Sequence, residues 1–191
     1  MPSPLGHALG GAAAGWALAR PAAASRSRIW RLGVLFATLG MLPDLDLVTS
    51  VHRGPSHSLG MAAIVGLVAT ALSSHPRLGL AAAAAYATHT LLDWLSADTS
   101  VPLGIMALWP FDGHHYKSSR AVFDSVWRRN ETPDFWPHNI RAVAKEVAIL
   151  GPLTLIALLL QLRRSRSTDS HPQAEPNRRQ VTTTRRHDGT T

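Results

Sequence analysis

Cysteine is absent from this chain of 191 residues, and aromatic side chains make up only 6% of it. Without cysteine the protein forms neither disulfides nor thiolate metal sites. Any metal must then be held by histidine and carboxylate side chains, which suit zinc or a harder divalent ion. The chain also lacks a nucleophilic serine elbow, a phosphate-binding glycine loop and a dinucleotide fingerprint, which excludes the enzyme classes that depend on them.

Strand-forming residues are also scarce in the apolar parts of the chain, where alanine, leucine and glycine dominate. This composition favours helices over strands, so the sequence predicts an all-α fold. The expected helices coincide with five apolar stretches, at residues 5–19, 32–42, 59–72, 78–95 and 147–162. Glycines recur at intervals of about four in the first stretch, a spacing that lets helices approach closely.

Two architectures fit these stretches: a multi-pass membrane bundle with short, polar-interrupted helices, or a soluble alanine-rich bundle. Several stretches are shorter than the ~20 residues that span a bilayer. However, residues 153–162 are almost uninterrupted in their apolar character and are followed at once by Arg163 and Arg164, which favours the membrane. We therefore expect residues 1–162 to form a helical membrane domain of about five apolar helices. A cleaved signal peptide fits less well, because no basic residue precedes the first stretch.

The C-terminal residues 163–191 are almost all polar, with seven arginines against three acidic residues. This segment lacks the apolar surface that folding requires, so we expect a disordered basic tail. A basic tail beside an apolar segment is typical of a cytoplasmic flank close to anionic membrane lipids. The alternative is that the basic tail binds nucleic acid. No nucleic-acid-binding motif supports this, and we expect no nucleic-acid partner.

Basic residues also predict the orientation of the helices. Arginines crowd the first connection, around residues 20–31, and Arg77 lies in the third. The positive-inside rule places these connections and the tail in the cytoplasm and the N-terminus outside. The connection from Asp98 to Arg141 also contains basic residues, although this topology places it outside. Long loops carry less weight in the positive-inside rule, so the assignment stands. This topology directs seven polar residues toward one membrane face: His7, Asp44, Asp46, His52, His57, His89 and Asp93.

Carboxylates and imidazoles at the ends of apolar segments require an explanation. An isolated charge costs several kcal/mol to desolvate, so buried ones are normally paired or bound to metal. Asp44 and Asp46 follow Pro43, and His57 closes a Gly-Pro loop, whereas His89 and Asp93 lie one turn apart on one helix face. Taken alone, Asp44 and Asp46 fit a solvated turn, and His89 and Asp93 fit a His–Asp hydrogen bond that ties helices together.

Taken together, these residues predict a divalent-metal site, with zinc the expected ion and the number of ions left open. Arg53 is expected to stabilise developing negative charge, and His52 to carry protons or serve as a spare ligand. A structural contact between Arg53 and one of the two aspartates is the alternative. The predicted metal ligands are His7, Asp44, Asp46, His57, His89 and Asp93.

Several motifs occur in a familiar order over about residues 5–111. They are Gly6-His7, Leu42-Pro43-Asp44-Leu45-Asp46, His52-Arg53-Gly54-x-Ser56-His57-Ser58-Leu59, His89-x-x-Leu92-Asp93, Val101-Pro102-Leu103 and Leu108-Trp109-Pro110. In these motifs the chain resembles the YdjM-like family of bacterial inner-membrane, metal-dependent hydrolases. The resemblance implies a multi-pass helical protein with a divalent-metal site.

A fainter similarity is to zinc-dependent phospholipase C and the P1-type nucleases, which are helical enzymes that cleave phosphoesters. It implies ligand roles for His7, one of the two aspartates in 44–46, His57, His89 and Asp93. The later histidines and the late glutamate of that pattern have no clear counterparts in this chain, so one or two metal ions are expected. The candidates for these positions are His114, His115, His138 and Glu146.

The sequence thus predicts a membrane-bound hydrolase in which a metal lowers the pKa of a bound water to about 7. The expected substrate is a phosphoester or related ester, from a lipid or another envelope component. The competing class is a non-catalytic integral membrane protein, in which the His/Asp set is a structural metal staple or a hydrogen-bond network.

Overall fold

The computed structural model describes residues 1–19, 25–48, 53–98, 101–128 and 130–169. Within these residues the fold is all α and contains no strand, which confirms the predicted class. The elements are α1 (Pro4–Leu18), α2 (Arg26–Met41), α3 (Leu59–Ser73), α4 (Pro76–Trp94) and α5 (Phe135–Asp169), with two short 3-10 helices, η1 (Leu42–Val48) and η2 (Pro55–His57).

Two helices extend beyond the apolar stretches that predicted them. α2 begins at Arg26 because Ser25 caps it, accepting a hydrogen bond from the backbone N–H of Arg28, and because arginine is a good helix former. α5 begins at Phe135, well before the apolar run, and continues past the predicted boundary at Leu162 to Asp169. Helices predicted from apolar stretches alone leave out these polar turns. Residues 170–191 of the predicted tail lie outside the described residues.

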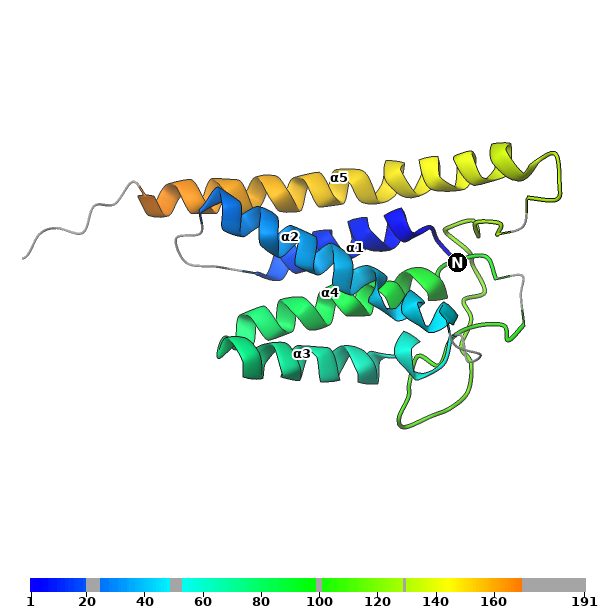
Figure 1. The fold of residues 1–191 in the computed structure, drawn as a ribbon, viewed down its shortest axis with the longest axis horizontal. Helices are drawn as coiled ribbons and strands as arrows, with labels where there is room; N and C mark the ends of the chain where they lie inside the picture. The colour runs from blue at the N-terminus through cyan, green and yellow to red at the C-terminus, as the bar shows by residue number, and fades with distance from the viewer. Residues whose placement is uncertain (20–24, 49–52, 99–100, 129, 170–191) are drawn as a thin grey trace, which may run out of the picture.

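The five helices lie side by side with their axes close to one direction (Figure 1). α1 and α5 run parallel, as their hydrogen bonds show. The hydroxyl of Thr154 donates to the carbonyl of Leu9, and about two turns further along both helices the amide of Gln161 donates to the carbonyls of Trp16 and Ala19. The long connection after α4 and the start of α1 lie at one end of the bundle. The start of α2, the α3–α4 turn and the end of α5 lie at the other.

Glycines bring α1 and α2 into close contact, as their spacing predicted. A Cβ atom on Gly11 would lie 2.9 Å from the Cα of Gly40 and would also meet the carbonyl oxygen of Phe36, whose ring lies against Gly15. Such distances are too short for any side chain. The close approach brings the end of α2, and with it η1, against α1 and α4.

Five membrane-spanning helices are not confirmed. Among the described helices, only the part of α5 at Phe135–Ser165, 31 residues long, is long and apolar enough to cross a bilayer by the criteria of length and composition. α3 is apolar but shorter, at 15 residues. At about 1.5 Å per residue it is about 22 Å long, less than the ~30 Å of the hydrocarbon core.

Candidate metal centre

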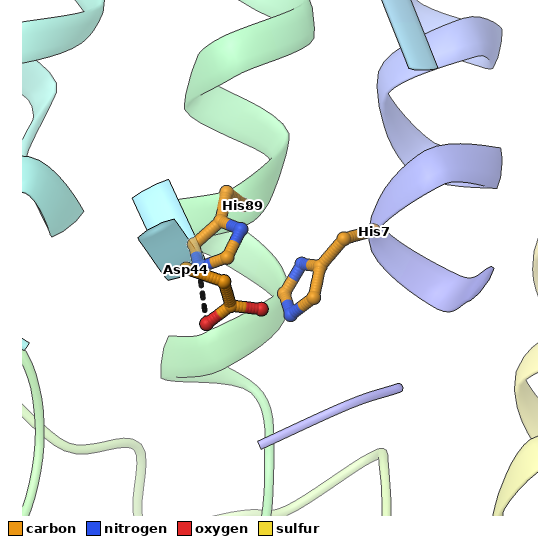
Figure 2. A group of neighbouring side chains, drawn as sticks. All are labelled: His7, Asp44 and His89. Atoms are coloured by element: carbon orange, nitrogen blue, oxygen red, sulfur yellow. Dashed lines mark ion pairs between the residues drawn. The ribbon is translucent and has the colours of Figure 1, made fainter. Parts of the chain in front are cut away.

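Four elements bring histidine and aspartate side chains together at one end of the bundle. His7 comes from α1, Asp44 from η1, His57 from the end of η2, and His89 and Asp93 from the last turns of α4. Figure 2 shows His7, Asp44 and His89 converging from three of these elements. The three histidines are completely buried, and the Asp93 side chain is only 1% exposed.

The carboxylate of Asp93 lies next to all three histidines. Its Oδ1 is 3.5 Å from the Nε2 of His7, and its Oδ2 lies 3.5 Å from the Nε2 of His57 and 3.3 Å from the Nε2 of His89. These distances exceed the 2.7–3.2 Å of ordinary N–H···O hydrogen bonds. The atoms therefore face one another without forming well-made hydrogen bonds.

Asp44 approaches two of the same histidines. Its Oδ1 lies 3.8 Å from the Nε2 atoms of both His57 and His89. Donor atoms bound about 2.0–2.1 Å from a tetrahedral zinc ion lie about 3.3–3.4 Å apart, close to the separations found here. Two overlapping groups of three, His7–Asp44–His89 and His57–His89–Asp93, each have their donor atoms within 4.8 Å of one another.

Several polar atoms of this cluster are buried with no hydrogen-bond partner among the described residues. They are Nδ1 and Nε2 of His7, Oδ1 of Asp44, Nε2 of His89 and both carboxylate oxygens of Asp93. A buried polar atom without a partner costs about 1–3 kcal/mol, so a concentration of them is unfavourable unless something binds them. A divalent cation would bind one ring nitrogen of each histidine together with carboxylate oxygens of the aspartates. The cluster fits a metal ion, and zinc as its identity stays a prediction.

Groups behind the histidines fix their orientation. The Nδ1 of His89 lies 2.8 Å from the carbonyl oxygen of Gly40, which only accepts hydrogen bonds. Nδ1 therefore carries the proton, and in the neutral ring Nε2 presents its lone pair to the cluster. This is the arrangement in which histidines bind metals.

Asp46 lies behind His57, outside both groups of facing donor atoms. Its Oδ2 is 3.1 Å from the Nδ1 of His57 and accepts hydrogen bonds from the Ser56 hydroxyl at 2.7 Å and the backbone N–H of Arg53 at 3.2 Å. The geometry gives Asp46 an orienting role for His57, and its predicted role as a direct ligand stays a prediction.

The carboxyl group of Asp44 is biased toward its charged form. Burial disfavours the charge, but the nearby imidazole of His57 and the positive charge that His89 and His7 carry when protonated outweigh burial and lower the pKa of Asp44 below its usual value. A carboxylate must be deprotonated to bind metal, so this shift favours a ligand role at neutral pH.

Asp46→Asn is expected to lower the affinity for Zn²⁺ by about 10–100-fold, the usual effect of losing a group that orients a ligating histidine. Isothermal titration of metal-stripped protein in detergent measures this loss. The control is Asp124→Asn, because Asp124 is an exposed residue paired with Lys145. An unchanged affinity would contradict the orienting role, and a loss of more than about 100-fold would indicate a direct ligand.

Arg53 lies beside the centre, but its guanidinium group points to another partner. Its Nη1 is 2.7 Å from both carboxylate oxygens of Asp98 and 3.0 Å from the carbonyl oxygen of Pro102. Asp98 also accepts a hydrogen bond of 2.6 Å from the backbone N–H of Gly104. The expected alternative, a structural contact between Arg53 and one of the two aspartates, is present through the backbone N–H of Arg53, which donates to Asp46, while its guanidinium pairs with Asp98. His52 lies outside the described residues, and the catalytic roles of both residues stay predictions.

The structure gives Glu146, the late carboxylate candidate, a different position. Glu146 is completely buried, and its Oε1 accepts a hydrogen bond of 2.8 Å from the backbone N–H of Ser3, while Oε2 bonds the Ser3 hydroxyl. It therefore binds the free N–H end of α1, where a negative charge is favourable. Nothing in the sequence pairs Ser3 with Glu146, which lies 143 residues away.

The three late histidines do not join the cluster either. The Nδ1 of His114 lies 2.5 Å from a carboxylate oxygen of Asp112 on the surface, and His115 is exposed. The Nε2 of His138 bonds the carbonyl of Ser125 at 2.8 Å. Within the part of the chain that the structure describes, the donor set is therefore His7, Asp44, His57, His89 and Asp93.

The fold and the site together define the class: a helical bundle with one helix long and apolar enough to cross a bilayer, and a buried His/Asp cluster that could hold a metal ion. The model of a family described as YdjM inner membrane protein matches residues 1–171. The chain therefore belongs to the YdjM inner membrane protein family, which confirms the family resemblance and supports an inner-membrane location. The metal-dependent hydrolase activity and the similarity to phospholipase C stay predictions. No curated protein and no solved structure matches the chain.

Proposed function

We propose that this protein is a multi-pass, metal-dependent hydrolase of the inner membrane that cleaves a phosphoester or related ester of a lipid or other envelope substrate. The observation that carries the proposal is the buried set of facing donor atoms from His7, Asp44, His57, His89 and Asp93. A divalent ion bound by such a set supplies Lewis-acid activation of water near neutral pH.

The chain's own residues have separate tasks in this proposal. Asp93 and Asp44 provide negative charge that balances a cation in a site from which water is largely excluded. The carbonyl of Gly40 and the carboxylate of Asp46 hold the Nδ1 protons of His89 and His57, so that each Nε2 would be free to bind an ion. Rigid ligands of this kind keep the reacting groups in place.

Exposure at the edge of the cluster supports a catalytic site. The side chain of Asp44 is 18% exposed, whereas those of His57, His89 and Asp93 are at most 1% exposed. Catalytic metal sites keep one position open to water or substrate. The Asp44 side is the face from which a substrate would enter.

The surface of the bundle supports insertion of more helices than α5. Large apolar side chains face outward on α2 and α3, among them Val34 at 67%, Leu67 at 71% and Leu72 at 84% exposure. Large exposed apolar side chains of this kind favour contact with lipid. Arg26, Arg77 and Arg164 lie on elements that meet at the end away from the cluster, consistent with the proposed topology in which the N-terminus is outside and the tail cytoplasmic.

A structural metal staple is the second candidate, and burial is the observation that favours it. Structural zinc sites are closed on all sides, and three of the donor residues here have no exposed surface at all. A staple would join α1, η1, η2 and α4 without turning over a substrate.

Hydrolysis of a chromogenic phosphodiester, and of phospholipid vesicles, by detergent-purified protein tests the proposal. Asp44→Asn is expected to lower the rate by more than about 100-fold, as loss of a metal ligand exceeds the 10–100-fold effect of an outer group, while the protein still inserts and folds. Asp124→Asn is the matched control, with unchanged rate. A metal-loaded wild type without turnover, together with a lower unfolding temperature in Asp44→Asn, would favour the staple.

A further inference from the structure

An apolar groove of about 390 Å³ runs along the side of the bundle between α1, α4 and α5. Its floor is formed by the small residues of α1, which lack side chains long enough to fill it. Longer aliphatic side chains of α4 and α5 form the walls. Representative residues are Gly10, Ala14 and Ala17 on the floor and Leu91, Leu153 and Leu160 on the walls.

The length of the groove matches one bilayer leaflet. Its wall on α5 extends from Leu150 to Leu160, which corresponds to about 15 Å of helix at 1.5 Å per residue. One leaflet contributes about half of the ~30 Å hydrocarbon core, also about 15 Å. These positions lie inside the stretch of α5 that qualifies as a membrane span. A single extended acyl chain therefore fits the groove in length and chemistry.

Positive charge lies at one end of the groove. Arg163 and Arg164 follow Leu160 by three and four residues, so they lie on the same face of α5 one turn further along. Both residues are exposed. Arginine at the end of a membrane helix binds phosphate groups of anionic lipids through charge-assisted hydrogen bonds.

We propose that the groove binds one acyl chain of an anionic phospholipid, whose phosphate group lies at Arg163 and Arg164. This end of the bundle is opposite to the one that holds His7 and Asp93. The bound lipid is therefore distinct from a substrate of the metal centre. The inference rests on the proposed insertion of the bundle in the membrane and not on the proposed hydrolysis.

A second copy of the chain fits this groove less well. Two copies in one membrane have the same orientation, and a symmetric contact through this face would bring Arg163 and Arg164 of one copy against the same residues of the other. Like charges placed opposite each other disfavour such an interface. The charge that opposes a second copy favours an anionic lipid.

Native mass spectrometry of the full-length protein tests the inference, with phosphatidylglycerol or phosphatidylcholine added at equal concentration. Wild type is expected to retain one phosphatidylglycerol per protomer. Ala14→Phe, which fills the groove, is expected to lower that retention at least 10-fold, and a double variant, Arg163→Gln with Arg164→Gln, to remove the preference over phosphatidylcholine. Leu67→Phe is the control, because Leu67 is 71% exposed on α3, and is expected to behave as wild type.

Undiminished retention in Ala14→Phe would overturn the inference, as would a wild-type dimer that this variant dissociates. If Ala14→Phe fails to insert, the arginine variant decides, and an unchanged lipid preference overturns the inference. The metal content of the same samples is expected to be equal in all variants. Loss of lipid binding with metal retained, or the reverse, therefore separates this inference from the proposed metal centre.

Discussion

Asp93→Asn is expected to lower the affinity of the protein for Zn²⁺ by more than about 100-fold, beyond the 10–100-fold effect of outer-shell changes. The reason is that its two carboxylate oxygens face the Nε2 atoms of His7, His57 and His89 at 3.3–3.5 Å. An amide has the same shape but lacks the negative charge and offers only one acceptor atom. Isothermal titration of metal-stripped protein in detergent measures the affinity.

Thermal unfolding provides a second measurement for the same variant. A ligand that binds only the folded state raises the unfolding temperature, so added Zn²⁺ is expected to stabilise wild type and leave Asp93→Asn unchanged. Asp124→Asn is the control, because its carboxylate pairs with Lys145 at the surface. Equal stabilisation of wild type and Asp93→Asn would show that the metal binds elsewhere.

Asp98→Ala is expected to lower the free energy of unfolding by about 3–5 kcal/mol, because it leaves the buried guanidinium of Arg53 without its carboxylate. The two side chains are only 6% and 7% exposed, and they lie 2.7 Å apart. Arg53 also donates its backbone N–H to Asp46, so the pair helps to hold the loop that carries His57. Unfolding of the variant in detergent measures the loss.

The matched control is the exposed pair of Lys145 and Asp124, whose side chains are 44% and 49% exposed. Removing this pair is expected to cost less than about 1 kcal/mol. A double variant, Arg53→Met with Asp98→Leu, is expected to lose less stability than the sum of the two single changes. If Asp98→Ala is as mild as the surface control, the buried pair does not stabilise the loop.

The donor residues of the centre were predictable because the cost of burying charge is visible in a sequence. His89 and Asp93 lie four residues apart on α4, and their contact follows directly from helical spacing. His7 was harder to predict, since a single histidine in an apolar helix has many satisfied environments. Only the assumed topology brought it to the same end as Asp44 and His57.

The different positions of Asp44 and Asp46 could not be predicted. The two residues lie two positions apart in η1, and a 3-10 helix has about three residues per turn, so they point to different sides. One faces the histidine nitrogens of the cluster, and the other contacts the far side of His57. Choosing between them requires the position of η1 relative to η2.

Long-range partners were missed for a similar reason. The carbonyl of Gly40 reaches His89 on α4 once the glycines let α2 approach α1, and backbone groups leave no trace in a sequence pattern. No sequence motif links Asp98 or Glu146 to a distant residue. Their partners, Arg53 and Ser3, became evident only once the connections between helices were placed.

Metal analysis of protein purified in detergent without added metal tests the central claim most directly, with Asp93→Asn and Asp124→Asn purified in parallel. The account predicts at least one divalent ion per protomer in wild type and in Asp124→Asn, and little in Asp93→Asn. Chelator treatment is expected to remove the ion and lower the unfolding temperature of wild type. A metal-free wild type whose stability responds to neither zinc nor chelator would contradict the account.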